Sequence, residues 1–294
     1  MYTTHEKEIA SRYLGGGMAG MAGMSAATAT ATQDPIEAIK NTLSTIDVDG
    51  QTFFVAEGDI LLDSDEVLVY AVQRQAQELQ RLVGTVALSP GSGDLLGIKV
   101  GDKLVRWQVA LTLTYCVLKR SFSSEADYET VKQNMLSATK DWENVCGVKF
   151  QHKPELDDSP ITPPPAGVIF SVRQINANGN FIASAFFPND PPERRRVLID
   201  PTYFSTSFDK VGVLRHELGH VIGLRHEHIR SGAPPVCPDE TTVDTFPFTE
   251  YDPKSVMHYF CGGVGTRELA ISDIDKVGIL KLYGPPLESF RFVE

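Results

Sequence analysis

The feature that most constrains the fold of this chain is the run from His216 to His226, which reads HELGHVIGLRH. Because His216 and His220 are four residues apart, a helix would place both imidazoles on one face, one turn apart. Gly223 can end that helix with a positive φ angle. The chain can then turn back, so that His226 supplies a third nitrogen. Three imidazoles with one coordination position left for water favour a catalytic Zn²⁺ site over a structural one.

Glu217 directly follows the first of these histidines. There it can act as general base on the water held by the ion and later pass the proton to a leaving amine. The pattern H-E-x-x-H alone also occurs by chance in unrelated helices, but here a glycine falls where the geometry requires one. We therefore expect one catalytic zinc ion bound by His216, His220 and His226. We expect His152, His228 and His258 to be surface or hydrogen-bonded histidines.

A second segment, Ser255 to Tyr259, reads SVMHY and lies some thirty residues downstream. A tight turn there would let Met257 form an apolar floor beneath the metal ligands. Tyr259 would then bring its phenol towards the ion, as a weak fifth ligand or as a donor to a tetrahedral oxyanion. Taken alone, this segment would be an ordinary core or loop sequence, and its meaning depends on the histidine motif.

The 294 residues carry a formal charge of −11 and are 42% hydrophobic, which is enough for a substantial core. The acidic balance argues against a nucleic-acid partner, because phosphate binding requires a basic patch. We find no apolar run long enough for a membrane span. The residues before position 34 are rich in Gly, Ala, Met and Thr, and we expect a disordered tail or leader there rather than a typical secretory signal.

The four cysteines are Cys116, Cys146, Cys237 and Cys261. None has the spacing of a cysteine zinc site. Their even number suggests two disulfides and an oxidising compartment. Order along the chain favours Cys116–Cys146 and Cys237–Cys261, although four cysteines allow three connectivities and free buried thiols remain an alternative.

Periodicity and turn residues divide the chain into two parts. Before position 89 we expect two helices, over 35–43 and 65–83, and a short extended stretch at 52–55. The glycine-rich segment 89–101 is typical of a linker. After it we expect strands separated by helices, which indicates a sheet with helices packed on it. The expected strands span 107–118, 148–151, 168–173, 181–187 and 196–199. The expected helices span 125–145 and 272–282, and a further helix starts at about Asp209 with Ser207 as cap.

The motif H-E-x-x-H-x-x-G-x-x-H followed by a methionine turn resembles the metzincin peptidases. Glu227 directly after the third histidine, and the S-x-M-H-Y turn, are similar to the astacin family. Other stretches resemble the matrixins, and the likeness covers about residues 105 to 284. The matrixin-like stretches are Leu113 to Tyr115, Ala183 to Pro188, Asp273 to Ile274, and Leu282 to Gly284.

This resemblance implies an α+β fold: a metzincin (zincin-like) domain with a twisted, mixed, five-stranded sheet, a zinc-binding helix, a methionine turn and a C-terminal helix. It also implies that substrate peptides add to an edge strand above the cleft. Residues 180–187 would be that edge, with Ala183, Ser184, Ala185 and Phe186 as substrate-binding residues. The amides of Asn176 and Asn178 replace carboxylates that calcium would prefer, so we expect no second metal site there.

The first hundred residues resemble an astacin propeptide at Glu57-Gly58-Asp59, where the aspartate would ligate the zinc and displace water. A carboxylate is a good zinc ligand, and a neighbouring glycine lets the backbone approach closely. The aromatic residue of the family signature is Ala56 here, with Phe53 and Phe54 slightly upstream. Cleavage between about Gly91 and Arg106 would release the block. By the same resemblance, the new N-terminus would then pair with Glu227; the alternative is that Glu227 is a solvated charge at a helix end.

We therefore expect a tail or leader at 1–33, a mostly helical inhibitory propeptide at 34–104, a catalytic domain at 105–286 and a C-terminal tail at 287–294. The expected function is that of a secreted zinc metalloendopeptidase made as a latent zymogen. Its partners would be protein or peptide substrates and its own propeptide, and we favour a monomer. Two alternatives remain open: a non-catalytic zinc-binding interaction module, and a zinc amidase acting on small substrates.

Overall fold

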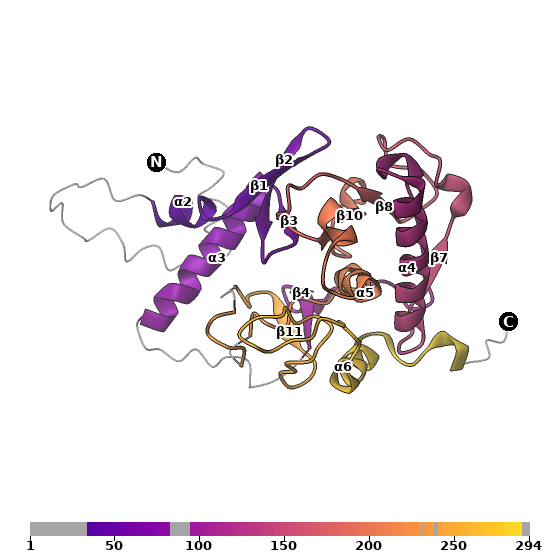
Figure 1. The fold of residues 1–294 in the computed structure, drawn as a ribbon. Coiled ribbons are helices and arrows are strands. Elements are labelled where there is room, and N and C mark those ends of the chain that lie inside the picture. Colours follow the sequence, from indigo (N-terminus) through magenta and orange to yellow (C-terminus); the bar gives the residue numbers. More distant parts are fainter. Residues whose placement is uncertain (1–33, 83–94, 231, 238–239, 290–294) are drawn as a thin grey trace. The chain divides into compact units, whose positions relative to one another are not determined.

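The computed structural model describes residues 34–82, 95–230, 232–237 and 240–289, and divides the chain into two compact units. The first unit comprises residues up to Ala56 together with Leu61–Ser89; the second comprises Glu57–Ile60 and everything from Pro90 onwards. The expected tail at 1–33 lies outside the described residues, as do 83–94 and 290–294. Figure 1 labels the elements of both units.

The first unit combines two helices with a three-stranded sheet of order β1-β2-β3. Helix α2 (Pro35–Lys40) begins where the Asp34 side chain accepts a hydrogen bond from the Ile36 amide, and α3 spans Ser64–Leu82. Ile36 packs against a buried face of α3 made of Leu68, Ala71 and Val72. The strands are β1 (Ser44–Val48), β2 (Gln51–Ala56) and β3 (Ile60–Leu62).

The expectation of a mostly helical region here missed the hairpin. β1 and β2 pair antiparallel, and only Asp49 and Gly50 separate Val48 from Gln51. Both loop residues have positive φ angles, 58° and 80°, as a two-residue hairpin turn requires. The Asp-Gly pair was therefore a signal for this turn.

The second unit is built on a five-stranded mixed sheet of order β7-β6-β8-β10-β9. β6, β7, β8 and β10 run parallel, whereas β9 is an antiparallel edge strand beside β10. The bounds are β6 (Thr112–Val117), β7 (Lys149–His152), β8 (Phe170–Gln174), β9 (Ala183–Ser184) and β10 (Arg196–Ile199).

Two of these strands are shorter than the sequence predicts, because turns interrupt them. Before β6, Ala110 has a φ angle of 67° and the Leu111 amide donates to the Gln108 carbonyl. Around β9, Asn180 closes a turn onto Ala177 on one side, and the Phe187 amide donates to Asp190 on the other. The expected strand at 181–187 is therefore reduced to Ala183–Ser184.

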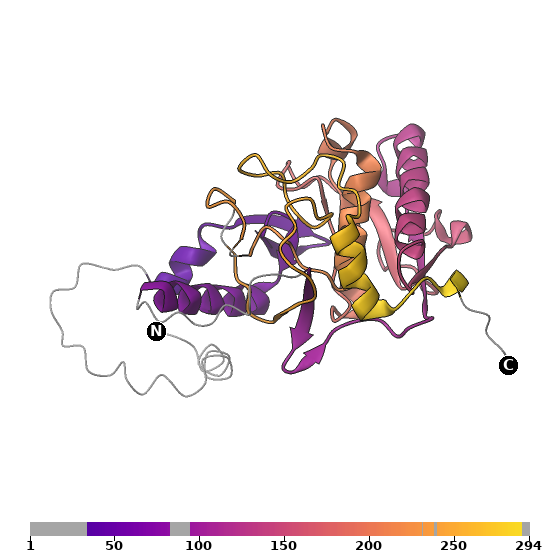
Figure 2. The same ribbon diagram turned by 90° about the horizontal axis from the view of Figure 1, so that it is seen from below.

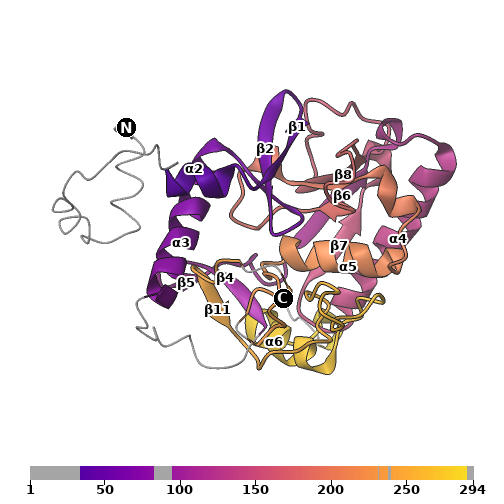
Figure 3. The same ribbon diagram turned by 60° about the vertical axis from the view of Figure 1, so that its left-hand side comes forward.

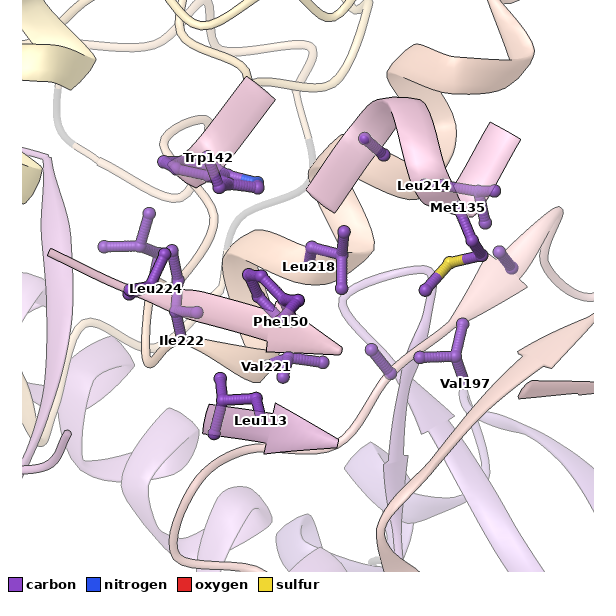
Figure 4. Packing of buried hydrophobic residues seen from close by; sticks show 14 of the residues in the cluster. Leu113, Met135, Trp142, Phe150, Val197, Leu214, Leu218, Val221, Ile222 and Leu224 are labelled. Carbon is purple, nitrogen blue, oxygen red and sulfur yellow. The ribbon is translucent and has the colours of Figure 1, made fainter. Parts of the chain in front are cut away.

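Helices α4 (Glu125–Glu143) and α5 (Lys210–Val221) pack on each other and on this sheet. The Trp142 indole nitrogen of α4 donates to the Arg215 carbonyl of α5 at 2.9 Å. Figure 3 shows α5 running beside the strands. Figure 4 shows the core between these layers, where Met135 and Trp142 of α4 meet residues of α5 and of the strands, among them Leu214, Leu218, Leu113, Phe150 and Val197.

A second small sheet of order β11-β4-β5 lies in the same unit. It consists of β4 (Leu96–Val100), β5 (Lys103–Leu104) and β11 (Thr245–Pro247). β4 falls within the segment that we expected to be a linker, so that expectation was wrong from residue 96 onwards. Gly97 is required there because a Cβ would lie 2.4 Å from the Phe248 ring.

The last helix, α6 (Asp273–Tyr283), begins with a capping box between Ser272 and Asp275. Figure 2 follows the chain beyond α6 to the end of α4, where Lys140 pairs with Glu288 at 3.2 Å. Short 3₁₀ helices complete the element list: η2 (Lys119–Ser121), η3 (Pro154–Leu156), η4 (Pro192–Arg194), η5 (Pro201–Phe204) and η6 (Leu287–Ser289). Among the described residues, no helix has the length and apolar character needed to cross a membrane.

The structure forms one of the two expected disulfides, Cys237–Cys261, with a Cα–Cα distance of 5.2 Å. Cys116 and Cys146 are free buried thiols, so the expected pair between them is wrong. Side chains alternate along a strand. Tyr115 and Val117 of β6 belong to the core cluster that contains Cys146, whereas Cys116 between them does not. Cys116 therefore faces away from its expected partner.

Candidate metal centre

Helix α5 carries the first two histidines and is capped by Asp209, whose carboxylate accepts from the Gly212 amide at 2.6 Å. Ser207, the expected cap, instead accepts from Arg267. One turn separates His216 from His220, and their ring centroids lie 5.0 Å apart. The spacing thus brings both imidazoles to one face of the helix, as the sequence predicts.

Gly223 ends this helix and reverses the chain. Its φ angle is 95°, and a Cβ there would lie 2.8 Å from the Val105 carbonyl oxygen. The next amide, of Leu224, donates back to the Gly219 carbonyl at 2.9 Å. A non-glycine residue would therefore suffer both backbone strain and a steric clash. The reversal carries His226 to the other two histidines.

The Nδ1 atom of each of these three histidines lies at hydrogen-bond distance from an oxygen acceptor. His216 donates to the Val256 carbonyl at 2.8 Å, His220 donates to the Leu224 carbonyl at 2.8 Å, and His226 faces the Glu57 carboxylate at 3.0 Å. These acceptors assign the proton to Nδ1 and leave the Nε2 lone pair available. An acceptor on the outer nitrogen is the usual arrangement for histidines that bind metals.

The three Nε2 atoms converge on the carboxylate of Asp59. The oxygens of Asp59 lie 3.4 Å from His216, 3.8 Å from His220 and 3.2 Å from His226. The ligand atoms of all four residues fall within 4.8 Å of one another, and all four residues are buried. Asp59 belongs to the segment Glu57–Ile60, which groups with the second unit.

This set of donors fits a divalent ion. The Nε2 atoms of His220 and His226 lie 3.1 Å apart, and the His216 Nε2 atom is buried without a hydrogen-bond partner in the described structure. Two bare lone pairs would repel at this distance, so the nitrogens share either a proton on His226 or a metal ion. Neutral imidazole and carboxylate are ligands that zinc prefers.

Electrostatics in the metal-free chain differ between the histidines. Burial lowers the pKa of His220 well below its ordinary value, and neighbouring His226 adds to the effect. Burial also opposes the charge on His226, but Asp59 and Glu57 outweigh it and raise the pKa of His226 to about 9. Without a metal, His226 therefore carries the proton that balances the buried carboxylates.

Glu217 lies beside this cluster, and its Oε2 atom is buried without a hydrogen-bond partner in the described part of the chain. Burial, reinforced by the nearby Asp59 carboxylate, raises the pKa of Glu217 well above its ordinary value. A carboxyl group whose proton affinity is raised in this way is suited to accept a proton and return it.

The turn at Met257 lies directly against α5. A Cβ added to Gly219 would lie 2.3 Å from the Met257 sulfur, so the turn approaches the helix as closely as a glycine permits. Asp275 of α6 holds the turn: its carboxylate accepts from the Ser255 hydroxyl at 2.6 Å and from the Val256 amide at 2.8 Å. The Val256 carbonyl is in turn the acceptor for His216.

Tyr259 stacks its ring on the histidine cluster, with centroid distances of 5.6 Å to His216 and 4.7 Å to His226. Burial raises the pKa of its phenol well above 10, and the carboxylate of Asp59, to which the phenol is hydrogen-bonded, adds to this effect. The phenol thus reaches the group that lies among the three Nε2 atoms. His228 is buried rather than at the surface: its Nδ1 atom accepts from the Tyr259 amide at 3.5 Å, and its ring stacks on that of Tyr259 at 4.3 Å.

Glu227 is fully buried and already has partners. One carboxylate oxygen accepts from Arg230 at 2.8 Å and from the Asp252 amide at 3.0 Å. The other oxygen, Oε2, is buried without a hydrogen-bond partner in the described structure. Glu227 is therefore not a solvated charge at a helix end.

A cavity of about 260 Å³ adjoins the metal centre. His216, Glu217 and Asp59 form one wall. Apolar residues form most of the rest: Phe181, Ile182, Ala183, Phe208, Val213, Phe260 and Leu269. Of the four residues expected to bind substrate, Ala183 lines this cavity, and Ala183 and Ser184 form the edge strand. Ala185 and Phe186 belong to the core cluster behind it.

Two residues of the site were not predicted from the sequence. Glu57 accepts from Arg225 while it also faces His226. Arg225 immediately precedes the third histidine, so its place in the motif was a signal that it lies at the site. Glu57 is two residues before Asp59, but nothing local in the sequence indicates which residue it pairs with.

The sequence model of the matrixin family matches residues 106–233. This match supports a metzincin. It spans the sheet, α4, α5 and the third histidine, and it indicates a domain of the zinc metalloprotease class. A comparison with curated protein sequences finds no match. Two solved structures of myroilysin are similar to this chain. The first has 16% sequence identity and a TM-score of 0.44, and the match covers 60% of this chain and 95% of the myroilysin chain. The second has 15% sequence identity and a TM-score of 0.42, and the match covers 60% of this chain and 85% of the myroilysin chain.

Proposed function

We propose that this chain is a zinc-dependent metalloendopeptidase that is held latent by Asp59. The observation that carries the proposal is the convergence of the three Nε2 atoms beside the orphaned carboxylate of Glu217. A zinc ion held by His216, His220 and His226 supplies Lewis acidity, which polarises a peptide carbonyl and activates water. The match to the matrixin family supports the same chemistry.

The residues of the chain have distinct proposed roles. Glu217 takes the proton from the attacking water and returns it to the leaving amine, a role for which its raised pKa suits it. Tyr259 donates a hydrogen bond to the oxygen that gains negative charge, in the place where its phenol now contacts Asp59. Met257 and Gly219 fix the floor beneath the histidines.

Substrate binding is proposed at the edge strand and the cavity. β9 is hydrogen-bonded to β10 alone among the described strands, which leaves its other edge for an extended peptide. The apolar cavity beside Glu217 then takes an apolar side chain next to the scissile bond. Such an arrangement favours protein and peptide substrates over the small substrates of an amidase.

Latency is proposed because Asp59 lies where a substrate carbonyl and water would have to bind. Cleavage after the described first unit would release it, with Glu227 as the residue that then meets the new N-terminus. Its unpartnered Oε2 atom supports this role. Secretion is part of the proposal, since the Cys237–Cys261 disulfide favours an oxidising compartment.

The proposal is tested by casein hydrolysis with the processed chain. We expect hydrolysis that a chelator abolishes and zinc restores, and that Glu217→Ala lowers by a factor of about 10² to 10⁴ without loss of bound zinc. Zinc binding without hydrolysis of any protein would favour the non-catalytic module. Hydrolysis of small amides alone would favour the amidase.

A further inference from the structure

The guanidinium of Arg225 lies at the edge of the metal centre, where the only carboxylate paired with it in the described structure is that of Glu57. The side chain of Arg225 is 14% exposed and that of Glu57 is 1% exposed, so both partners of the pair are largely removed from water. The second oxygen of Glu57 faces His226 Nδ1 at 3.0 Å.

A contact that does not involve Glu57 also holds Arg225 in place. Its guanidinium lies over the ring of Phe187, a residue of the expected catalytic domain, at 5.8 Å from the ring centroid. Phe187 in turn packs edge-on against His220, with ring centroids 5.3 Å apart. The cation is therefore fixed relative to two of the three metal-binding histidines, whether or not Glu57 is present.

Release of the segment Glu57–Ile60 would remove the carboxylate and leave the cation. The Nε atom of Arg225 is already buried without a hydrogen-bond partner in the described structure. A largely buried guanidinium that loses its counter-ion must be hydrated or must pair with another anion. Planar carboxylates are the groups that it binds best. The processed site would thus present an unpaired positive charge next to the place of reaction.

A substrate peptide bound at the metal centre would lie next to the position that Glu57 now occupies. Glu57 is only two residues from Asp59, which lies among the three Nε2 atoms. A peptide whose scissile carbonyl takes the place of the Asp59 carboxylate would carry side chains at a similar separation from the histidines. Neither Arg225 nor Glu57 lines the apolar cavity, so this position is distinct from the one that takes the apolar side chain.

We propose that Arg225 determines specificity: in the processed chain its guanidinium binds a Glu or Asp side chain of the substrate within two residues of the scissile bond. Glu57 occupies this subsite in the latent chain. The inference rests on the proposed peptidase function and adds a class of substrate to it, namely peptides with an acidic residue at one fixed position and an apolar residue at another.

The test uses quenched fluorescent peptides that differ only in Glu or Gln at each of the two positions on either side of the scissile bond. At one position we expect the processed chain to have a kcat/KM about tenfold or more higher for Glu, as a charge-assisted contact implies. Arg225→Gln should bring the ratio near one, and Arg225→Glu should favour Lys at that position. Arg120→Gln, on an exposed arginine, is the matched control and should keep the wild-type ratio.

A ratio near one in the wild-type chain, or a preference for Glu that survives Arg225→Gln, would overturn the inference while leaving the peptidase function intact. If no peptide is cleaved, the proposed function fails. Binding then decides the question for Arg225: zinc-loaded, processed Glu217→Ala chain is titrated with the same peptide pairs by calorimetry. Tighter binding of the Glu peptide that is lost with Arg225→Gln supports the inference, and equal binding overturns it.

Discussion

The Nε2 atoms of His220 and His226 lie 3.1 Å apart, with the Nδ1 atom of each ring engaged by an oxygen acceptor. Two bare lone pairs would repel at this distance in a buried site, so the two nitrogens share the proton of His226 in the metal-free chain and would share the ion once zinc is bound. This relationship is the physical basis of the proposed zinc centre.

The first prediction concerns metal content. The purified chain should bind one zinc ion per molecule, and His220→Ala should reduce this to well below one, because fewer imidazoles then hold the ion. Elemental analysis by mass spectrometry after dialysis measures both. His152→Ala is the control, since His152 pairs with Asp157 and lies outside the cluster. Full zinc content in His220→Ala would contradict the assignment.

The second prediction concerns pH. In the metal-free chain the pKa of His226 is raised from 6.5 to about 9, so at pH 7.5 this residue holds a proton that it lacks when unfolded. The stability from this charge is complete below about pH 6.5 and is lost as the pH rises through about 9. Zinc needs the neutral ring and must displace that proton.

Zinc affinity of the unprocessed chain should therefore rise by about tenfold per pH unit from about 7 to about 9 and then level off. Titration against a competing chelator of known pH dependence measures it. Glu57→Gln should flatten the slope by removing one carboxylate that holds the proton on His226. An affinity independent of pH over this range would show that His226 is neutral in the metal-free chain.

The third prediction concerns latency. Asp59→Ala should raise the peptidase activity of the unprocessed chain, because it removes the carboxylate that lies among the three Nε2 atoms. Casein hydrolysis before and after processing provides the comparison, and the gain should be confined to the unprocessed form. Asp63→Ala, outside the cluster, is the control. Unchanged latency in Asp59→Ala would assign the block to another group.

The fourth prediction concerns the contact between α5 and the methionine turn. Gly219→Ala should lower the free energy of unfolding by about 1–3 kcal/mol, since the added methyl group would lie 2.3 Å from the Met257 sulfur. Urea unfolding measures this. In the double variant Gly219→Ala, Met257→Ala, the alanine at 219 should cost less than it does alone. Strictly additive effects would mean that the two side chains do not interfere.

The fifth prediction concerns the cysteines. In denaturant without reductant, two thiols per chain should react with a thiol reagent, and after reduction all four should react. Without denaturant the two free thiols should react slowly, because burial raises the pKa of both Cys116 and Cys146 to about 12. Finding no free thiol in the denatured chain would show that Cys116 and Cys146 form a disulfide after all.

The parts of the site that could be predicted from the sequence are those whose geometry is local. The spacing of His216 and His220, the turn at Gly223 and the helix expected from Ser272 each depend on residues within a few helical turns. The approach of Asp59 to these histidines was accessible only through the resemblance to a known family, since 157 positions separate Asp59 from His216.

The expectations that failed depended on contacts between distant residues or on faces of the sheet. The pairing of Cys116 with Cys146 was inferred from order alone, and strand alternation overrides it. β4 was missed because glycines at 97 and 101 are typical of a linker. Gly97 instead lies within a strand, where any larger side chain would clash with the Phe248 ring. The pair of Arg225 with Glu57 was missed because 168 positions separate the two residues, and neither residue's own surroundings in the sequence indicate its partner.

The close contact of Gly219 with Met257 bears on what happens when the metal is lost. The helix and the turn pack directly against each other without an ion, and the Asp275 carboxylate accepts hydrogen bonds from Ser255 and Val256 of the turn. The arrangement of α5 and the methionine turn that supports the histidines therefore forms without the metal. A stripped molecule should keep its shape and regain its metal on simple readdition, unlike small zinc modules that collapse when their ion is withdrawn.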